Sequence, residues 1–131
     1  GLRSYGSMTY TGFKSLLYAD VSRDDPRVQA AFQWIRKYWR LDANPNMPRK
    51  SSLQGLYYYY HVFAKALRAW GRPVIRDTDG QEHNWRHELI DALGRRADQD
   101  GSWKNAADRW FESNKTLATC YAVLALQEAL K

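Results

Sequence analysis

The sequence predicts an all-α fold built from helical hairpins. Five segments carry apolar residues at helical spacing between helix start and stop signals, and no segment alternates convincingly as a strand. The first, third and fifth segments are apolar or aromatic on most sides, whereas the second and fourth are amphipathic. A chain of 131 residues is the size of one domain with a buried core. We therefore expect a single domain, residues 1–131, with about five main helices.

The first two helices form the first expected hairpin. Residues 8–19 are small or apolar on all sides, which predicts a helix buried on several sides. The second helix begins with Asp25 as its cap and Pro26 at the first helical position. Its apolar stripe consists of Val28, Ala31, Phe32, Ile35 and Trp39. The proline and asparagine residues of 41–52 then predict a loop.

The third helix, 56–70, is expected to end at Gly71, with Pro73 beyond it. Its apolar face is widened by rings and alanines. In the connection that follows, the Asp-Thr-Asp-Gly sequence of 77–80 predicts a turn that closes a short hairpin or loop.

The last two helices again differ in type. The fourth, 84–97, is expected to bury Trp85, Leu89, Ala92 and Leu93 and to expose its charged side. The fifth, 115–130, is almost continuously small or apolar from 117 to 126, which predicts a buried helix.

A repeat underlies this alternation. Residues 5–10, 54–59 and 100–103 each place a glycine and then an aromatic residue before an apolar helix. The glycines are nearly evenly spaced, at a period typical of helical-hairpin arrays. The expected units are approximately 5–52, 53–98 and 99–131, so the last unit lacks its outer helix.

Residues 99–103, Gln-Asp-Gly-Ser-Trp, resemble the Gln-Trp repeat motif of squalene-hopene cyclases and protein prenyltransferase beta subunits. Residues 118–127 resemble the inner helix that follows this motif, and 54–60 look like a degenerate second copy. The similarity is closest to bacterial prenyltransferase/squalene-oxidase repeat proteins. The resemblance implies a partial α/α toroid, in which inner helices line a barrel and outer helices wrap it.

The motif also has a physical interpretation. Gly101 permits a tight path into the next helix, Trp103 covers helix ends, and Gln99 can bond terminal backbone groups. We therefore expect Gln99, Gly101 and Trp103 to be structural.

The catalytic residues that the resemblance implies are missing. The cyclases use an Asp-x-Asp-Asp box, but Asp20 and Asp24-Asp25 have the wrong spacing, and residues 77–80 lack the final acid. The prenyltransferases bind zinc through Asp, Cys and His, but Ala118 stands two positions before Cys120, where Asp-x-Cys is needed. A proton donor in either acidic segment is disfavoured against a cap or a turn.

A metal or cofactor is not expected. His83 and His87 are four positions apart, which predicts one helix face, but no third ligand accompanies them and a solvated pair is the favoured interpretation. Cys120 is expected to be a small buried hydrophobe, and it has no second cysteine with which to pair. The Cys-Gly-Glu-Gln motif of toroid thioester domains is also absent.

Aromatic residues make up 15% of the chain, and they supply the candidate ligand-lining positions. A run of rings on an inner helix either faces the lumen, where it would bind an apolar ligand or stabilise a cation, or builds the core, which is the favoured alternative. His61 has two interpretations: a general acid or diphosphate partner, or a satisfied, partly buried histidine. The candidate lining residues are Tyr57, Tyr58, Tyr60, His61, Trp110 and Tyr121.

Residues 105–112 mix charge with large rings, which predicts a loop over the toroid mouth. Asp108, Arg109 and Glu112 are its charged groups near an inner-helix start. No nucleophile, base and oxyanion donor are fixed within mutual reach, so no catalytic triad is predicted.

Charge and hydropathy exclude other classes of protein. The net charge is +6, but the basic residues are scattered among acids, so we expect no nucleic-acid binding. No apolar run reaches the length of about 20 residues that a transmembrane helix needs, and the first ten residues lack the pattern of a signal peptide. A soluble bacterial domain is expected.

Two function hypotheses follow. The first is a squalene cyclase/prenyltransferase-like repeat domain whose parent protein binds an isoprenoid or another apolar small molecule. The second is a non-catalytic binding or scaffold domain that mediates protein interactions. Because so few hairpins cannot close a ring, the outermost inner helices should expose apolar surface that the rest of the parent chain or self-association covers.

Overall fold

The computed structural model describes residues 4–131, and its helices confirm the all-α class. The main helices are α1 (Gly6–Tyr18), α2 (Pro26–Lys37), α3 (Leu56–Trp70), α4 (Trp85–Arg96) and α5 (Lys115–Leu130). A short 3-10 helix, η1 (Arg49–Ser51), and a two-stranded sheet of β1 (Val74–Arg76) and β2 (Glu82–Asn84) complete the fold. No helix in this part of the chain is long and apolar enough to cross a membrane.

Side-chain caps set where three helices begin. The Asp25 carboxylate accepts a hydrogen bond from a backbone N–H of the first turn of α2 at 2.8 Å, with Pro26 at the first position. Asn84 and Asn114 cap α4 and α5 in the same way. At the other end of α3, Gly71 has a φ of 85°, the left-handed conformation of a glycine stop.

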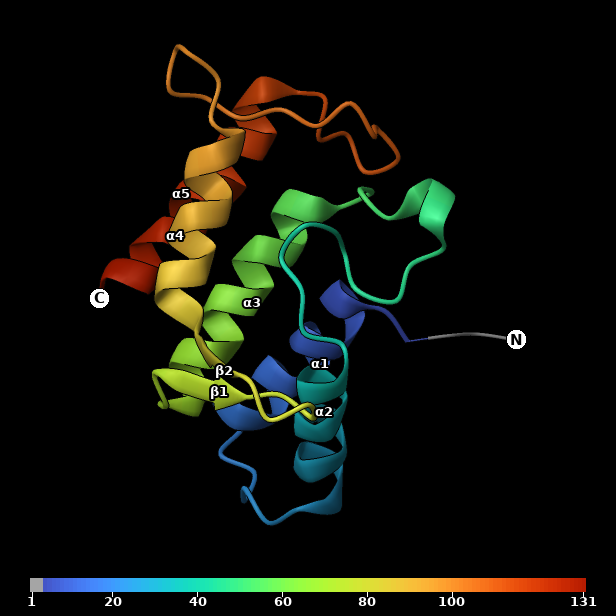
Figure 1. Cartoon of the computed structure of the whole chain (residues 1–131), viewed down its shortest axis with the longest axis vertical. Helices are drawn as coiled ribbons and strands as arrows, with labels where there is room; N and C mark the ends of the chain where they lie inside the picture. Colours follow the sequence, from blue (N-terminus) through green and yellow to red (C-terminus); the bar gives the residue numbers. More distant parts are fainter. Residues whose placement is uncertain (1–3) are drawn as a thin grey trace.

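Helices α1, α3 and α5 lie side by side in a row, α2 packs on α1, and α4 packs on α3 and α5 (Figure 1). The three helices of the row run in the same direction. Along α1 and α3, Tyr10 meets Tyr59 and, further on, Phe13 meets Trp70. The early residues of α5 likewise contact the early residues of α3, and the late residues contact the late ones. All three N-termini of the row are therefore at one end of the molecule.

The core is built mainly from rings around α3. Phe63, fully buried, contacts the rings of Tyr10, Tyr59, Trp39 and Trp85. Such edge-on and tilted ring pairs add to the stabilisation that burial alone supplies. The high aromatic content is thus largely used for packing, as one of the two sequence interpretations expects.

The prediction that the first and fifth helices are buried on several sides is wrong. Helix α5 buries chiefly alanines, at 118, 122, 125 and 129, and exposes Cys120, Val123, Leu124 and Leu130. Helix α1 exposes Met8 and Tyr18. These helices are the two ends of the row, so a neighbour in the row covers only one flank of each. Apolar side chains are therefore exposed at both ends of the row.

The β1–β2 hairpin packs beside the C-terminal end of α2. Ile75 pairs with His83 in its antiparallel register. The Thr78 N–H donates to the Arg36 carbonyl at 3.3 Å, and the Arg36 guanidinium donates to the Arg76 carbonyl at 2.7 Å. The predicted turn at 77–80 is therefore confirmed.

Candidate functional site

A cavity of about 330 Å³ lies where α1, α3 and α5 begin. Rings from four separate segments surround it, together with a buried carboxylate. The lining residues are Tyr5, Ser7, Gly55, Tyr58, Trp110, Glu112 and Tyr121. Three of the candidate lining residues, Tyr58, Trp110 and Tyr121, are among them, and the sequence-predicted mouth loop supplies one wall.

Glu112 is the buried carboxylate, and it caps α3. Its Oε1 accepts a hydrogen bond from the Tyr57 N–H and its Oε2 accepts one from the Tyr58 N–H, both at 3.0 Å. The amide of Asn105 donates to Oε1 at 3.1 Å. The residue at the N-cap itself, Gly55, has a φ of 67° and no side chain to cap with. A carboxylate from a distant loop therefore replaces the missing side-chain cap of α3. Its negative charge also interacts favourably with the positive end of the helix dipole.

The aromatic wall continues along α3 past the cavity. The ring of Tyr121 lies edge-on to Tyr58 at 5.6 Å and stacks on His61 at 5.8 Å. Burial, followed by the charges of Lys65 and Lys14, lowers the pKa of His61. Its buried Nδ1 has no hydrogen-bond partner within residues 4–131. His61 thus lies beside the cavity wall, held by stacking on Tyr121.

Tyr57 and Tyr60, which the sequence also offered as ligand-lining residues, are not part of the wall of this cavity. Both are buried, and burial raises the pKa of Tyr57 to about 12. The Tyr60 hydroxyl donates to the Leu41 carbonyl at 2.5 Å and accepts from Arg96 at 3.0 Å. Residues three apart share a helix face, so this pair faces the 41–44 loop and α4, whereas Tyr58 and His61 face the cavity side.

The Gln-Asp-Gly-Ser-Trp motif ties α4 to α5. The Trp103 indole N–H donates to the Leu93 carbonyl at 2.9 Å, in the last turn of α4, where carbonyls lack helical partners. Its backbone N–H donates to the Thr119 hydroxyl at 3.0 Å, and Gly101 has a φ of 80°. The capping role expected of Gln99 is not observed, because its exposed side chain makes no hydrogen bond in the described chain. Flanking backbone bonds close that turn instead.

The other charged residues singled out in the mouth loop are not among the residues that line the cavity. Asp108 accepts hydrogen bonds from the hydroxyl and backbone N–H of Ser113. The Arg109 guanidinium lies 4.9 Å from the centre of the Trp110 ring. Of the charged residues singled out in this loop, only Glu112 reaches the cavity wall.

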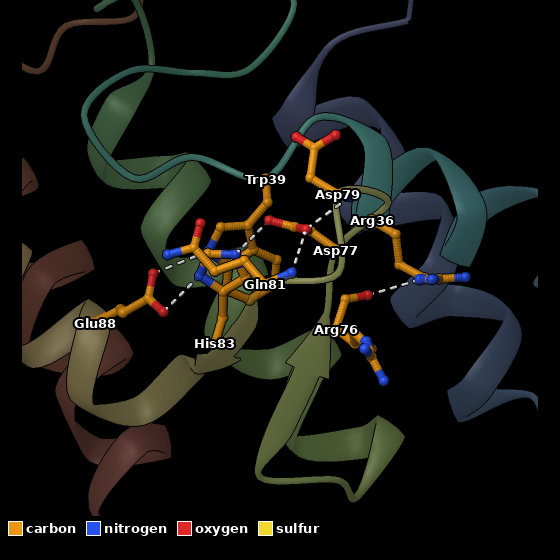
Figure 2. A network of polar contacts seen from close by, with 8 residues as sticks. All are labelled: Arg36, Trp39, Arg76, Asp77, Asp79, Gln81, His83 and Glu88. Carbon is orange, nitrogen blue, oxygen red and sulfur yellow. Dashed lines mark hydrogen bonds and ion pairs between the residues drawn. The ribbon is translucent and has the colours of Figure 1, made fainter.

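A second polar cluster joins the β-hairpin to α4 (Figure 2). His83 Nδ1 lies 2.7 Å from Glu88 Oε2, and its Nε2 lies 2.8 Å from Asp77 Oδ2. Trp39 stacks on the imidazole at 4.7 Å and donates its indole N–H to Glu88 Oε1 at 3.0 Å. The prediction that His83 and His87 share a helix face is wrong, because His83 lies in β2 and is buried.

This cluster fixes structure. Both ring nitrogens of His83 are engaged by carboxylates, and the second oxygen of Asp77 accepts the N–H groups of Asp79 and Gln81 within the turn. Within residues 4–131, no group of three or more His, Cys, Asp and Glu side chains is arranged to hold a metal ion. We therefore conclude that the cluster has a structural role: it holds the end of α2, the hairpin and α4 together.

No family model, curated protein or solved structure matches this chain. The aromatic cavity and the His83 cluster are therefore the features from which function is inferred. The cavity is the more open of the two to a ligand, since every polar group of the cluster already has a partner.

The His83 cluster predicts acid sensitivity. The hydrogen bond from His83 is the largest cause that lowers the pKa of Asp77. The contribution of this hydrogen bond to the free energy of unfolding is fully present above the ordinary aspartate pKa of about 3.9. It is lost as the pH falls through the lower pKa that Asp77 has in the folded protein. The difference in urea midpoint between wild type and Asp77→Asn should therefore narrow between about pH 6 and about pH 3. A difference for Asp77→Asn that stays constant over this pH range would contradict the assignment.

Proposed function

We propose that this chain is a binding domain of the squalene cyclase and prenyltransferase repeat type, and that its cavity takes an isoprenoid or another apolar small molecule. The observation that carries the proposal is the cavity at the start of α1, α3 and α5, which four rings line. Its volume of about 330 Å³ is at the lower end of the range for small-molecule sites. Rings with polar edges bind apolar molecules by contact and orient them by their hydroxyl groups.

The N-terminus of α3 lies beside the cavity, and its surroundings favour an uncharged portion of a ligand over an anionic head group. All four N-terminal N–H groups of α3 already have acceptors: Leu53 and Gly55 carbonyls take two, and Glu112 takes the other two. An anionic head group would face the Glu112 carboxylate and find no free backbone donor there. The apolar body of the ligand, rather than a diphosphate, is therefore the part that fits this cavity.

Binding is favoured over catalysis because the candidate acids have structural partners. Asp25 caps α2 and pairs with Arg27, and Asp77 binds His83 and its own turn. Neither lines the cavity. The only carboxylate that does, Glu112, is fully engaged with α3 and Asn105.

The repeat assignment rests on arrangement. A glycine and then an aromatic residue lie in or before the first turns of each helix of the row, and the three run in parallel while α2 and α4 return between them. This is the order that inner and outer helices of a hairpin array require. The sequence resemblance implies an α/α toroid, of which this chain would form only a part. We propose a partial toroid from the helix arrangement and the resemblance together.

Native mass spectrometry of the full chain with squalene, farnesol and farnesyl diphosphate tests the cavity. We expect squalene or farnesol to be retained, and Tyr121→Ala and Tyr58→Ala each to weaken retention about ten-fold or more, because a ring contact is lost. Tyr18→Ala, which removes an exposed ring outside the cavity, is the matched control and should bind as wild type does. Retention that is unaffected by the cavity variants, or no retention of any of the three molecules, would contradict the proposal.

A scaffold function is the second candidate, and a specific observation favours it. The free flank of α5 exposes Val123, Leu124 and Leu130. At the other end of the row, a wide apolar hollow lies between α1 and α2, with Met8 and Trp34 among its walls. Exposed apolar surface at both ends of a helical array suits contact with further chain or with a second copy. An oligomer that retains none of the three molecules in the same mass spectra would favour this function.

A further inference from the structure

Two loops at one end of the helix row present apolar side chains to solvent. Phe111 is 71% exposed, Trp110 51% and Leu53 40%. The loops touch, since the Asn105 amide donates to the Leu53 carbonyl at 2.6 Å. Both lie at the end where α3 and α5 begin, and the loop before α5 protrudes there (Figure 1). These three side chains are called the apolar tip below.

The backbone at Phe111 has a strained conformation, and its ring is exposed to solvent. Its φ of 66° is a left-handed conformation, which a bulky residue rarely adopts. The conformation is fixed on both sides: the Phe111 N–H donates to the Asp108 carbonyl at 3.1 Å, and the next residue, Glu112, is fully buried at the start of α3. Neither strain nor exposure of a ring stabilises the folded chain, so both point to a function at the tip.

Basic side chains predominate in the segments that carry the apolar tip. The same two loops expose Arg49, Lys50, Lys104 and Arg109. Asp108 is the one exposed acidic residue within 49–54 and 104–113. Its carboxylate accepts hydrogen bonds from Ser113. Within 49–54 and 104–113, exposed basic side chains therefore outnumber exposed acidic ones, and the Arg109 guanidinium lies 4.9 Å from the centre of the Trp110 ring.

We propose that this end of the domain docks on an anionic lipid surface. Phe111, Trp110 and Leu53 enter the headgroup region, and the four basic side chains contact the negative lipids around them. Large rings flanked by lysine and arginine are the composition of interfacial membrane-binding segments. A protruding tip enters a fluid surface readily, whereas a folded protein partner would need a hollow of matching shape. Trp110 belongs to both the apolar tip and the cavity wall, so the cavity lies next to the docked surface.

Co-sedimentation of the full chain with vesicles tests the proposal. One set contains phosphatidylcholine alone, and the other contains phosphatidylcholine and phosphatidylserine in equal amounts. We expect binding to the second set that weakens with added salt, and much weaker binding to the first. Phe111→Asn should lower the partition coefficient at least about ten-fold, and Arg109→Ala should lower it about five-fold.

The folded state supplies a second readout. Asparagine tolerates the left-handed conformation better than phenylalanine does, so Phe111→Asn should leave the urea midpoint unchanged or raise it while vesicle binding falls. A loss of binding with intact stability separates a docking role from a structural one. A clear fall in the urea midpoint of Phe111→Asn alongside its loss of vesicle binding would overturn the proposal.

Matched controls lie at the opposite end of the row. Leu130→Asn removes an equally exposed apolar side chain from the C-terminal end of α5, and Arg72→Ala removes an exposed charge just beyond α3. Both should bind vesicles as wild type does. Wild-type protein that fails to sediment with anionic vesicles, or Leu130→Asn losing as much binding as Phe111→Asn, would refute the proposal.

Discussion

Replacement of Glu112 by alanine is expected to lower the free energy of unfolding by about 3 kcal/mol. The change removes the acceptor of the Tyr57 and Tyr58 N–H groups and of the Asn105 amide. A buried donor that loses its partner costs roughly 1–3 kcal/mol, and water that enters from the adjacent cavity recovers part of that cost. The loss also removes a negative charge from the positive end of α3.

Glu112→Gln separates geometry from charge. The amide keeps one acceptor oxygen but places an N–H₂ group against a backbone N–H, so we expect a smaller loss of about 1–2 kcal/mol. Glu82→Gln, which makes the same change on an exposed side chain, should stay within about 0.5 kcal/mol of wild type. Urea unfolding followed by circular dichroism measures all three. If Glu112→Ala were as stable as Glu82→Gln, the capping role would be refuted.

Gly6→Ala is expected to destabilise the fold by about 2–3 kcal/mol. A Cβ at this position would overlap Pro45 Cδ and lie 2.8 Å from Asn44 Oδ1 and 2.9 Å from Tyr59 Cε1. These atoms cannot move easily, because the Gly6 N–H donates to the Pro45 carbonyl and Asn44 accepts the N–H of Ser7. The close approach of α1 to the 44–45 loop therefore requires glycine.

Gly12→Ala is the matched control on the same helix. No atom lies within 4 Å of a Cβ built at Gly12, so the alanine gains helix propensity without a clash. We expect it to raise the free energy of unfolding by about 0.5–1 kcal/mol. Opposite signs for the two glycines, measured by thermal and urea unfolding, are the expected result; a destabilised Gly12→Ala together with a neutral Gly6→Ala would contradict the packing described.

The helices were predictable because their end signals are local. Asp25 with Pro26, and Gly71 after an apolar run, specify a start and a stop within a few residues. The turn at 77–80 was predictable for the same reason. Burial of α1 and α5 was not, because an apolar helix at the end of a row and one in its middle have similar sequences.

The candidate site was predictable in part. Trp110 and Glu112 lie in a loop that its mixed charge and rings placed over a toroid mouth. The partners of Glu112 are more than fifty residues away in sequence, so its capping role could not be predicted. The run from Tyr57 to Tyr60 has no polar face that fixes which rings turn inward. His83 was misplaced because a spacing of four suggests a helix, whereas a short strand ends at Asn84.

The central position of α3 has a consequence for stability. It packs against α1, α4 and α5, whereas the end helices of the row each lack a neighbour on one flank. A change that removes a buried side chain from α3 therefore disturbs contacts with three helices at once, whereas a change on the free flank of α1 or α5 disturbs none of the contacts within the row.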